Sequence, residues 1–217
     1  MGPMRAAHAH DHRHPQWGEP RRSLLRRLLA SASAALGVSK PAASSGLPEL
    51  PLALQHGELA EAYLAAERGA DHRRAAAGAV TAMDRAIAAE EWWPADVWAH
   101  RALWHFEQAG ATLHATRQAR RIGDLRAAAG DPGSARRYYA EAIDEARDIG
   151  AEHEQGLAAL GLGRSLLELN DVTGARRLAG AAVDLLGRAR APVGEIDAAR
   201  ALLGSEVAVG PTTEEDG

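Results

Sequence analysis

Four histidines near the N-terminus are the residues whose type and spacing best suit chemistry. They occupy alternate positions: His8, His10, His12 and His14. Imidazoles spaced in this way along a flexible chain can chelate Ni²⁺, Zn²⁺ or Cu²⁺. We expect residues 1–20 to be a disordered, solvated tail, because they are rich in Gly, Pro, His and Arg and have no apolar period, and metal binding is the alternative. The chain has no Cys for a tight structural site, so we expect no cofactor beyond weak binding of Ni or Zn here.

No other pattern in the sequence predicts catalysis. It contains no Gly-rich phosphate loop, GxSxG, HExxH or CxxC motif. His100 and His105 are five residues apart, which is poor spacing for two ligands on one helical face. The adjacent acids Glu90 and Glu91 lie at an expected turn, where solvated capping is commoner than acid–base catalysis. We therefore expect a protein that is not an enzyme.

The charges are unevenly spread along the chain. Residues 1–49 carry seven Lys or Arg against three Asp or Glu, a net charge of +4. Residues 50–217 carry 18 against 26, a net charge of −8. A basic arm on an acidic body can touch that body, a membrane or an acidic partner. The overall net charge of −4 gives no reason to expect nucleic acid.

Residues 21–38 predict a basic amphipathic helix. Its leucines fall within one arc of a helical wheel, and Arg26 and Arg27 lie on the other side. The leucines of this docking helix are Leu24, Leu25, Leu28 and Leu29. We expect it to dock onto the chain's own body or onto a partner. Contact with an anionic membrane surface is an alternative.

The same segment also resembles an export signal. Arg21-Arg22 is similar to the start of a twin-arginine signal, and a weak apolar run follows from Leu28 to Val38. Residues 40–43 would then be the cleavage region. The extra Arg27 and the mild hydrophobicity favour a cytoplasmic protein, with export as the alternative. Residues 39–50 predict a linker rich in Ser, Pro, Ala and Gly.

Beyond this linker the chain repeats with a period of 40 residues. The best copy is Gly130–Gly150, which opens with a Gly-Asp-Pro turn and continues as an apolar-periodic helix. Its signature residues recur 40 positions apart at Ala95, Ala99 and Ala102, at Ala135, Tyr139 and Ala142, and at Ala175, Ala179 and Ala182. The pattern predicts helices over 51–68, 71–89, 94–109, 112–129, 133–148, 151–169, 172–188 and 193–205.

These features resemble the tetratricopeptide repeat, a family of helix pairs that stack into a solenoid. The family's Leu-Gly pair matches at Leu162-Gly163 and nearly at Ile122-Gly123, and its aromatic matches at Tyr139. The leading Trp and the closing Pro are missing, and the period is longer than usual. The resemblance implies an all-α, right-handed α-solenoid of about three and a half repeats over residues 51–205. Residues 206–217 predict an acidic, disordered tail.

The turns and helix crossings of these repeats carry physical signals. Gly130 and Asn170 suit the left-handed conformation that ends a helix. Asp131 and Asp171 suit the N-cap of the next helix, and a Pro follows the first of them. Small residues such as Gly163 let the paired helices approach closely.

A cluster of tryptophans marks one candidate contact surface. Positions that are Gly, Thr, Arg or Asp in the two later repeats are apolar or aromatic in the segment from 92 to 104. This predicted apolar patch consists of Trp93, Val97, His100 and Trp104. We expect the patch to be covered either by helix 51–68 or the 21–38 helix, or by a partner protein or a second copy of the chain.

The first helices of the pairs supply a second candidate surface. In tetratricopeptide arrays these helices line an inner groove that often binds extended peptides. The Gly register places Arg117, Arg120, Asp124, Leu157, Leu160, Arg164, Leu167 and Glu168 in this groove. Its arginines predict capture of an acidic peptide or a C-terminal carboxylate of another protein. The chain's own Glu214-Glu215-Asp216 segment is a candidate occupant, and an ordinary charged helix face is the alternative.

We therefore expect a non-catalytic adaptor or scaffold. The alternatives are an accessory factor that supplies or senses metal for a partner metalloenzyme, and an exported scaffold of the cell envelope.

Overall fold

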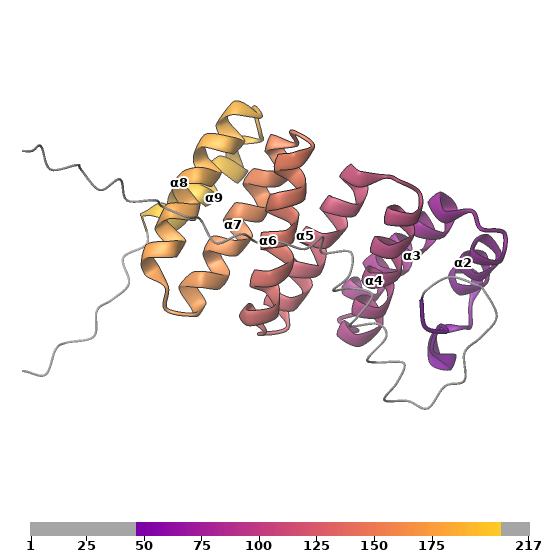
Figure 1. The fold of residues 1–217 in the computed structure, drawn as a ribbon. Coiled ribbons are helices and arrows are strands. Elements are labelled where there is room, and N and C mark those ends of the chain that lie inside the picture. The colour runs from indigo at the N-terminus through magenta and orange to yellow at the C-terminus, as the bar shows by residue number, and fades with distance from the viewer. Residues whose placement is uncertain (1–46, 205–217) are drawn as a thin grey trace, which may run out of the picture. The chain divides into compact units, whose positions relative to one another are not determined.

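The computed structural model describes residues 47–204 (Figure 1). This part of the chain is all-helical and opens with a short 3₁₀ turn, η1, at Leu52–Leu54. The α-helices are α2 (Glu58–Arg68), α3 (His72–Ala88), α4 (Trp92–Gln108), α5 (Thr112–Ala128), α6 (Pro132–Asp148), α7 (Glu152–Glu168), α8 (Val172–Arg188) and α9 (Val193–Leu203). The predicted 1–20, 21–38 and 206–217 segments, and most of the 39–50 linker, lie outside the described residues.

A 20-residue helical module underlies the 40-residue period. A residue with φ between 53° and 75° follows each helix from α2 to α8, at Ala70, Glu90, Gly110, Gly130, Gly150, Asn170 and Arg190. At each site the next backbone N–H donates to the carbonyl five residues earlier, at 2.8–2.9 Å. This pairing is the Schellman motif, which ends a helix and satisfies its last carbonyls. The predicted left-handed ends at Gly130 and Asn170 are confirmed.

Side-chain caps at the starts of α6 and α8 explain why two of the three full helix pairs are easy to recognise in the sequence. Asp131 Oδ1 accepts from the Ser134 backbone N–H at 2.9 Å, and Asp171 Oδ1 accepts from that of Gly174 at 2.8 Å. Pro132 lies in the first turn of α6, where its missing N–H costs nothing. The predicted caps are therefore confirmed.

Small residues hold the helices close together. The buried core is largely alanine, in two clusters that extend from α2 to α7 and from α7 to α9. The Tyr139 ring on α6 fills the space left by Gly123 on α5 and Gly161 on α7, because a Cβ at either glycine would overlap the ring. The helices can therefore pack closely around this aromatic ring.

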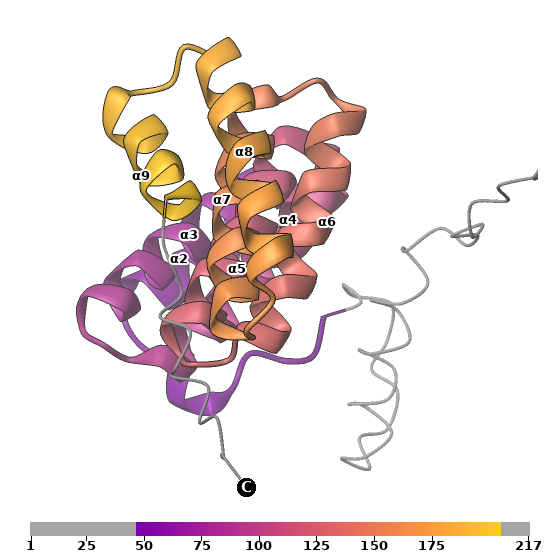
Figure 2. The same ribbon diagram turned by 90° about the vertical axis from the view of Figure 1, so that its left-hand side faces the viewer.

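The helices pack in successive antiparallel pairs: α3 with α4, α5 with α6, and α7 with α8. The first helices also contact one another, α5 with α7 and α7 with α9, and so form one layer of the array. Figure 2 shows α4 and α6 on one side of the view and α3 and α9 on the other. This layer of first helices positions the groove described below.

The observed helix starts differ from the predicted ones by more than one residue at two places. The first helix begins at Glu58 instead of residue 51, because Gly57 has φ 96° and interrupts the helical backbone after η1. The helix predicted from residue 94 begins at Trp92. Pro94 is its third residue, and a first-turn Pro loses no helical hydrogen bond.

Candidate functional site

Two hollows lie between the first helices α5 and α7. The larger, which we call the inner groove, has a volume of about 570 Å³. Its lining residues are Arg120, Asp124, Ala127, Ala128, Tyr139, Leu157, Leu160, Gly161, Arg164, Ser165 and Glu168. Six of the eight residues that the Gly register placed in a groove therefore line it. Arg117 lies instead at the second hollow, and Leu167 packs against the α7–α9 core.

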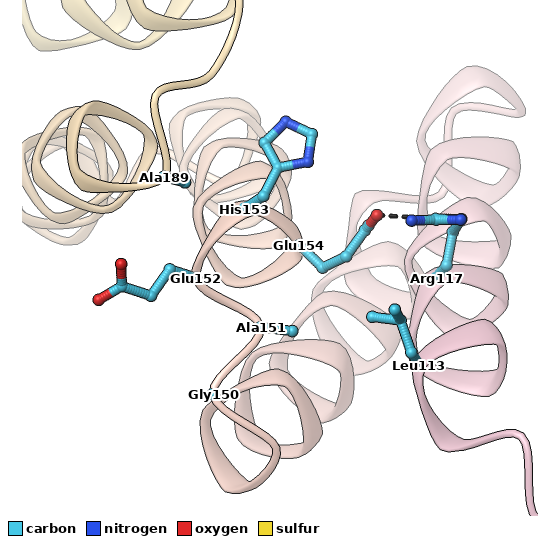
Figure 3. Close-up of a pocket in the computed structure, with 8 residues that line it drawn as sticks. All are labelled: Leu113, Arg117, Gly150, Ala151, Glu152, His153, Glu154 and Ala189. Carbon is cyan, nitrogen blue, oxygen red and sulfur yellow. Dashed lines mark hydrogen bonds and ion pairs between the residues drawn. The ribbon is translucent and has the colours of Figure 1, made fainter.

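The second hollow, of about 410 Å³, contains an acid that the sequence analysis missed (Figure 3). Glu154 on α7 is 4% exposed. It accepts from Arg117 Nε at 2.7 Å and from Arg120 Nε at 3.1 Å. These two guanidinium groups outweigh burial and hold the pKa of the Glu154 carboxyl below its usual range. Two of the three groove arginines thus already bind a carboxylate of the chain.

A second carboxylate of the chain, that of Asp124, also bonds to Arg120. Its Nη1 donates to Asp124 Oδ2 at 2.7 Å, and Tyr139 Oη donates to Asp124 Oδ1 at 2.8 Å. Burial, together with the nearby Asp124, raises the pKa of the Tyr139 phenol. Both oxygens of Asp124 are therefore engaged, and Tyr139 fixes that carboxylate at the groove.

Three polar side chains of the groove have no hydrogen-bond or ion-pair partner among residues 47–204. Arg164 and Glu168 are exposed, and neither makes a hydrogen bond or ion pair in the part of the chain described. Ser165 is 1% exposed, and its Oγ has no hydrogen-bond partner. A buried hydroxyl without a partner is costly. The inner groove therefore has unused hydrogen-bonding capacity at the end nearest the C-terminus of α7.

The four residues of the predicted apolar patch lie in different environments. Trp93 is 54% exposed, and its neighbour Trp92 is 44% exposed. Val97 packs partly buried against the core. His100 Nε2 lies 2.9 Å from Tyr138 Oη of α6, and the Trp104 ring meets the His72 ring of α3 edge to face. Helices α3 and α6 therefore supply much of the cover, and Trp93 remains the exposed part of the patch.

A buried polar cluster joins α2, α3 and α4, and sequence reasoning did not find it. Its members, here called the Tyr63 cluster, are Tyr63, Glu67, His72, Arg101 and His105. Tyr63, Arg101 and His105 are at most 3% exposed. The Tyr63 Oη atom lies 3.0 Å from Glu67 Oε1, 2.9 Å from His105 Nε2 and 3.0 Å from Arg101 Nη1. The signal in the sequence was Arg101, a charged residue among the apolar positions of a helix. Its role becomes clear only from its contacts with α2.

The Glu67 carboxylate at one end of the Tyr63 cluster determines which atoms of the cluster donate hydrogen bonds and which accept them. An ionised Glu67 only accepts, so Tyr63 donates to it and accepts from Arg101 and from His105 Nε2–H. His105 Nδ1, at 3.0 Å from His72 Nδ1, then accepts from His72. Burial, reinforced by His72 and Arg101, lowers the pKa of His105 to about 4. The cluster is a fully satisfied network with neutral His105.

Several predicted sites lie outside the described residues. They are the metal tract at His8, His10, His12 and His14, and the docking helix with Leu24, Leu25, Leu28 and Leu29. Within residues 47–204, no three His, Cys, Asp or Glu side chains lie together in a way that could hold a metal ion. No helix in the same range is long and apolar enough to cross a membrane.

No protein-family model matches the sequence, and a search of curated proteins finds no relative. The interpretation of the site therefore rests on its geometry.

Proposed function

We propose that this protein is an adaptor built on tetratricopeptide-like helix pairs, and that its inner groove binds an extended segment of another protein. One observation carries the proposal. The groove between α5 and α7 combines apolar side chains with hydrogen-bonding groups that have no partner within residues 47–204, at Arg164, Ser165 and Glu168. Peptide-recognition grooves have this combination, because apolar contacts provide binding energy and a few polar groups fix the register.

The geometry favours an extended segment over a compact ligand. Leu157, Leu160 and Arg164 lie on α7 within two turns of each other and line the same groove. The groove is bounded by parallel first helices, so a ligand can contact several turns of α7 in succession. Arg117 and Arg120 are occupied by Glu154. Recognition of an acidic group therefore centres on Arg164.

Selection from a random peptide display library tests this function directly. The full chain is the bait, and each enriched peptide is retested against Leu157→Arg and against Arg177→Gln. Leu157 is half-buried in the groove, and Arg177 is exposed on α8 outside it. We expect enriched peptides that bind the wild type and the Arg177→Gln chain equally and lose at least about tenfold in affinity with Leu157→Arg, about 1.4 kcal/mol.

Circular dichroism of each variant verifies that the helices are intact. An absence of enriched peptides would contradict the proposal. So would peptides that bind the Leu157→Arg chain as well as they bind the wild type.

A further inference from the structure

The unused groups of the inner groove form a site for a carboxylate. Arg164 is a cation without an ion pair in the described part of the chain, and the adjacent Ser165 hydroxyl is 1% exposed with no hydrogen-bond partner. Both residues line the inner groove, and a guanidinium and a hydroxyl can each donate to an oxygen of a carboxylate bound there. Asp124 does not fill this role, since Arg120 and Tyr139 hold both of its oxygens.

The chain leaves the described structure close to this site. Helix α9 ends at Leu203, and Leu202 packs against α7 at Gly163, where a Cβ would lie 2.9 Å from Leu202 Cδ2. Gly163 directly precedes Arg164 and Ser165. The C-terminal segment therefore begins beside the turn of α7 that carries the unused groups.

The segment that follows carries the matching charge. Glu214, Glu215 and Asp216 are consecutive acids, and ten residues separate Gly204 from the first of them. Ten extended residues reach about 35 Å, so the acids can reach any point of the inner groove. A link of about ten residues also gives an effective concentration of roughly millimolar, so a weak carboxylate contact is populated.

We propose that the acidic segment Glu214–Asp216 occupies the inner groove of its own chain, with a side-chain carboxylate bound by Arg164 and Ser165. The segment then competes with any partner peptide that uses the same carboxylate position. This consequence rests on the proposed function, whereas occupancy of the groove by the segment does not. Glu168, also at the groove, repels the carboxylate and keeps the contact weak enough to be displaced.

A peptide competition on the full chain tests the proposal. The neutralised chain carries Glu214→Gln, Glu215→Gln and Asp216→Asn. The probe is a synthetic peptide of residues 210–217 with an amidated end, so only side-chain carboxylates are offered. We expect calorimetry to show that it binds the neutralised chain at least about tenfold more tightly than the wild type, because the wild-type groove is occupied in cis.

Further substitutions in the neutralised chain locate the site. Arg164→Gln and Ser165→Ala should each weaken binding of the probe, the first by about tenfold or more. Glu168→Gln should strengthen it, because a like charge is removed. Arg177→Gln, on the exposed side of α8, is the matched control and should leave it unchanged.

Two results would overturn the proposal. Equal binding of the probe by the wild-type and neutralised chains would show that the segment does not occupy the groove. Binding that Arg164→Gln leaves unchanged would show that the carboxylate is held elsewhere. Either result leaves the adaptor function intact as long as display selection yields groove-dependent peptides, so the two proposals fail separately.

Discussion

The Tyr63 cluster and the inner groove are both polar sites between helices, but they differ in how completely their polar groups are paired. In the Tyr63 cluster each buried group has its partners, and Arg101, 3% exposed, bonds to Tyr63 and lies 3.5 Å from Glu67 Oε1. In the inner groove, Arg164 is exposed and Ser165 Oγ has no partner within residues 47–204. A closed network stabilises the helices that it joins, whereas an open one retains capacity for a ligand. Stability and binding should therefore respond to different substitutions.

Arg101→Ala is the strongest test of this difference. It leaves a carboxylate and a phenol of the Tyr63 cluster without their buried cation, and loss of one partner from a buried ionic network costs about 3–5 kcal/mol. We expect that loss in the free energy of unfolding, measured by urea denaturation. Arg177→Ala, at an exposed position of α8, is the control and should change it by less than about 0.5 kcal/mol. A loss below about 1 kcal/mol for Arg101→Ala would mean that the cluster does not hold α2 in place.

Acidification should weaken the same region. The folded pKa of His105, about 4, lies below its ordinary value of 6.5, so the unfolded chain binds the proton first. The stability from neutral His105 is present above pH 6.5 and is lost as the pH falls toward 4. The full pKa shift, from 6.5 to about 4, corresponds to about 3 kcal/mol of unfolding free energy. The groups facing His105 are Tyr63 and Glu67 on α2, His72 on α3, and Arg101 and Trp104 on α4.

Denaturation curves at several pH values between 7 and 4 measure this loss. Carboxylates also titrate near the lower limit, so the informative quantity is the difference between the wild type and His105→Gln. We expect a shallower dependence for the variant. Parallel curves for the two chains would contradict a neutral, buried His105.

Tyr63 and Tyr139 allow the Tyr63 cluster and the inner groove to be compared by the same substitution, Tyr to Phe. Tyr63 Oη has three polar partners, whereas Tyr139 Oη donates to Asp124, which Arg120 also binds. We expect Tyr63→Phe to cost about 2 kcal/mol and Tyr139→Phe about 1 kcal/mol of unfolding free energy, because an unsatisfied buried group costs more than one lost hydrogen bond. Thermal and urea unfolding of both variants give the order. The reverse order would contradict the assignment of the closed site to Tyr63.

The repeats could be predicted from sequence because local signals mark their boundaries. Asp131, Pro132 and Asn170 are specific for helix ends, and the helices from α3 to α9 lie within two residues of their expected bounds. The groove register also followed from the repeat, since residues 40 positions apart share a place. The left-handed residues at Ala70, Glu90 and Arg190 are not of the types that favour this conformation, so residue type alone does not mark these helix ends.

The ion pairs between helices could not be predicted, because they depend on long-range contacts that charge patterns do not encode. Glu154 looks like an ordinary first-turn acid of α7, yet it is buried by Arg117 and Arg120 from α5. Arg101 likewise stands among apolar positions of α4, and its partners come from α2. Such pairs appear only when the helices are placed side by side. The predicted charge of the groove was consequently too positive.

Of these substitutions, Arg117→Ala should have the smallest effect on the free energy of unfolding. The Arg117 side chain is 47% exposed, and Glu154 keeps its bond to Arg120 at 3.1 Å. Solvent screening and the second cation should limit the loss of unfolding free energy to about 1 kcal/mol or less. Urea denaturation beside Arg101→Ala measures the contrast between a half-exposed and a buried arginine. If Arg117→Ala costs as much as Arg101→Ala, the α5–α7 interface is as closed as the Tyr63 cluster, and a ligand would have to break an internal ion pair to enter it.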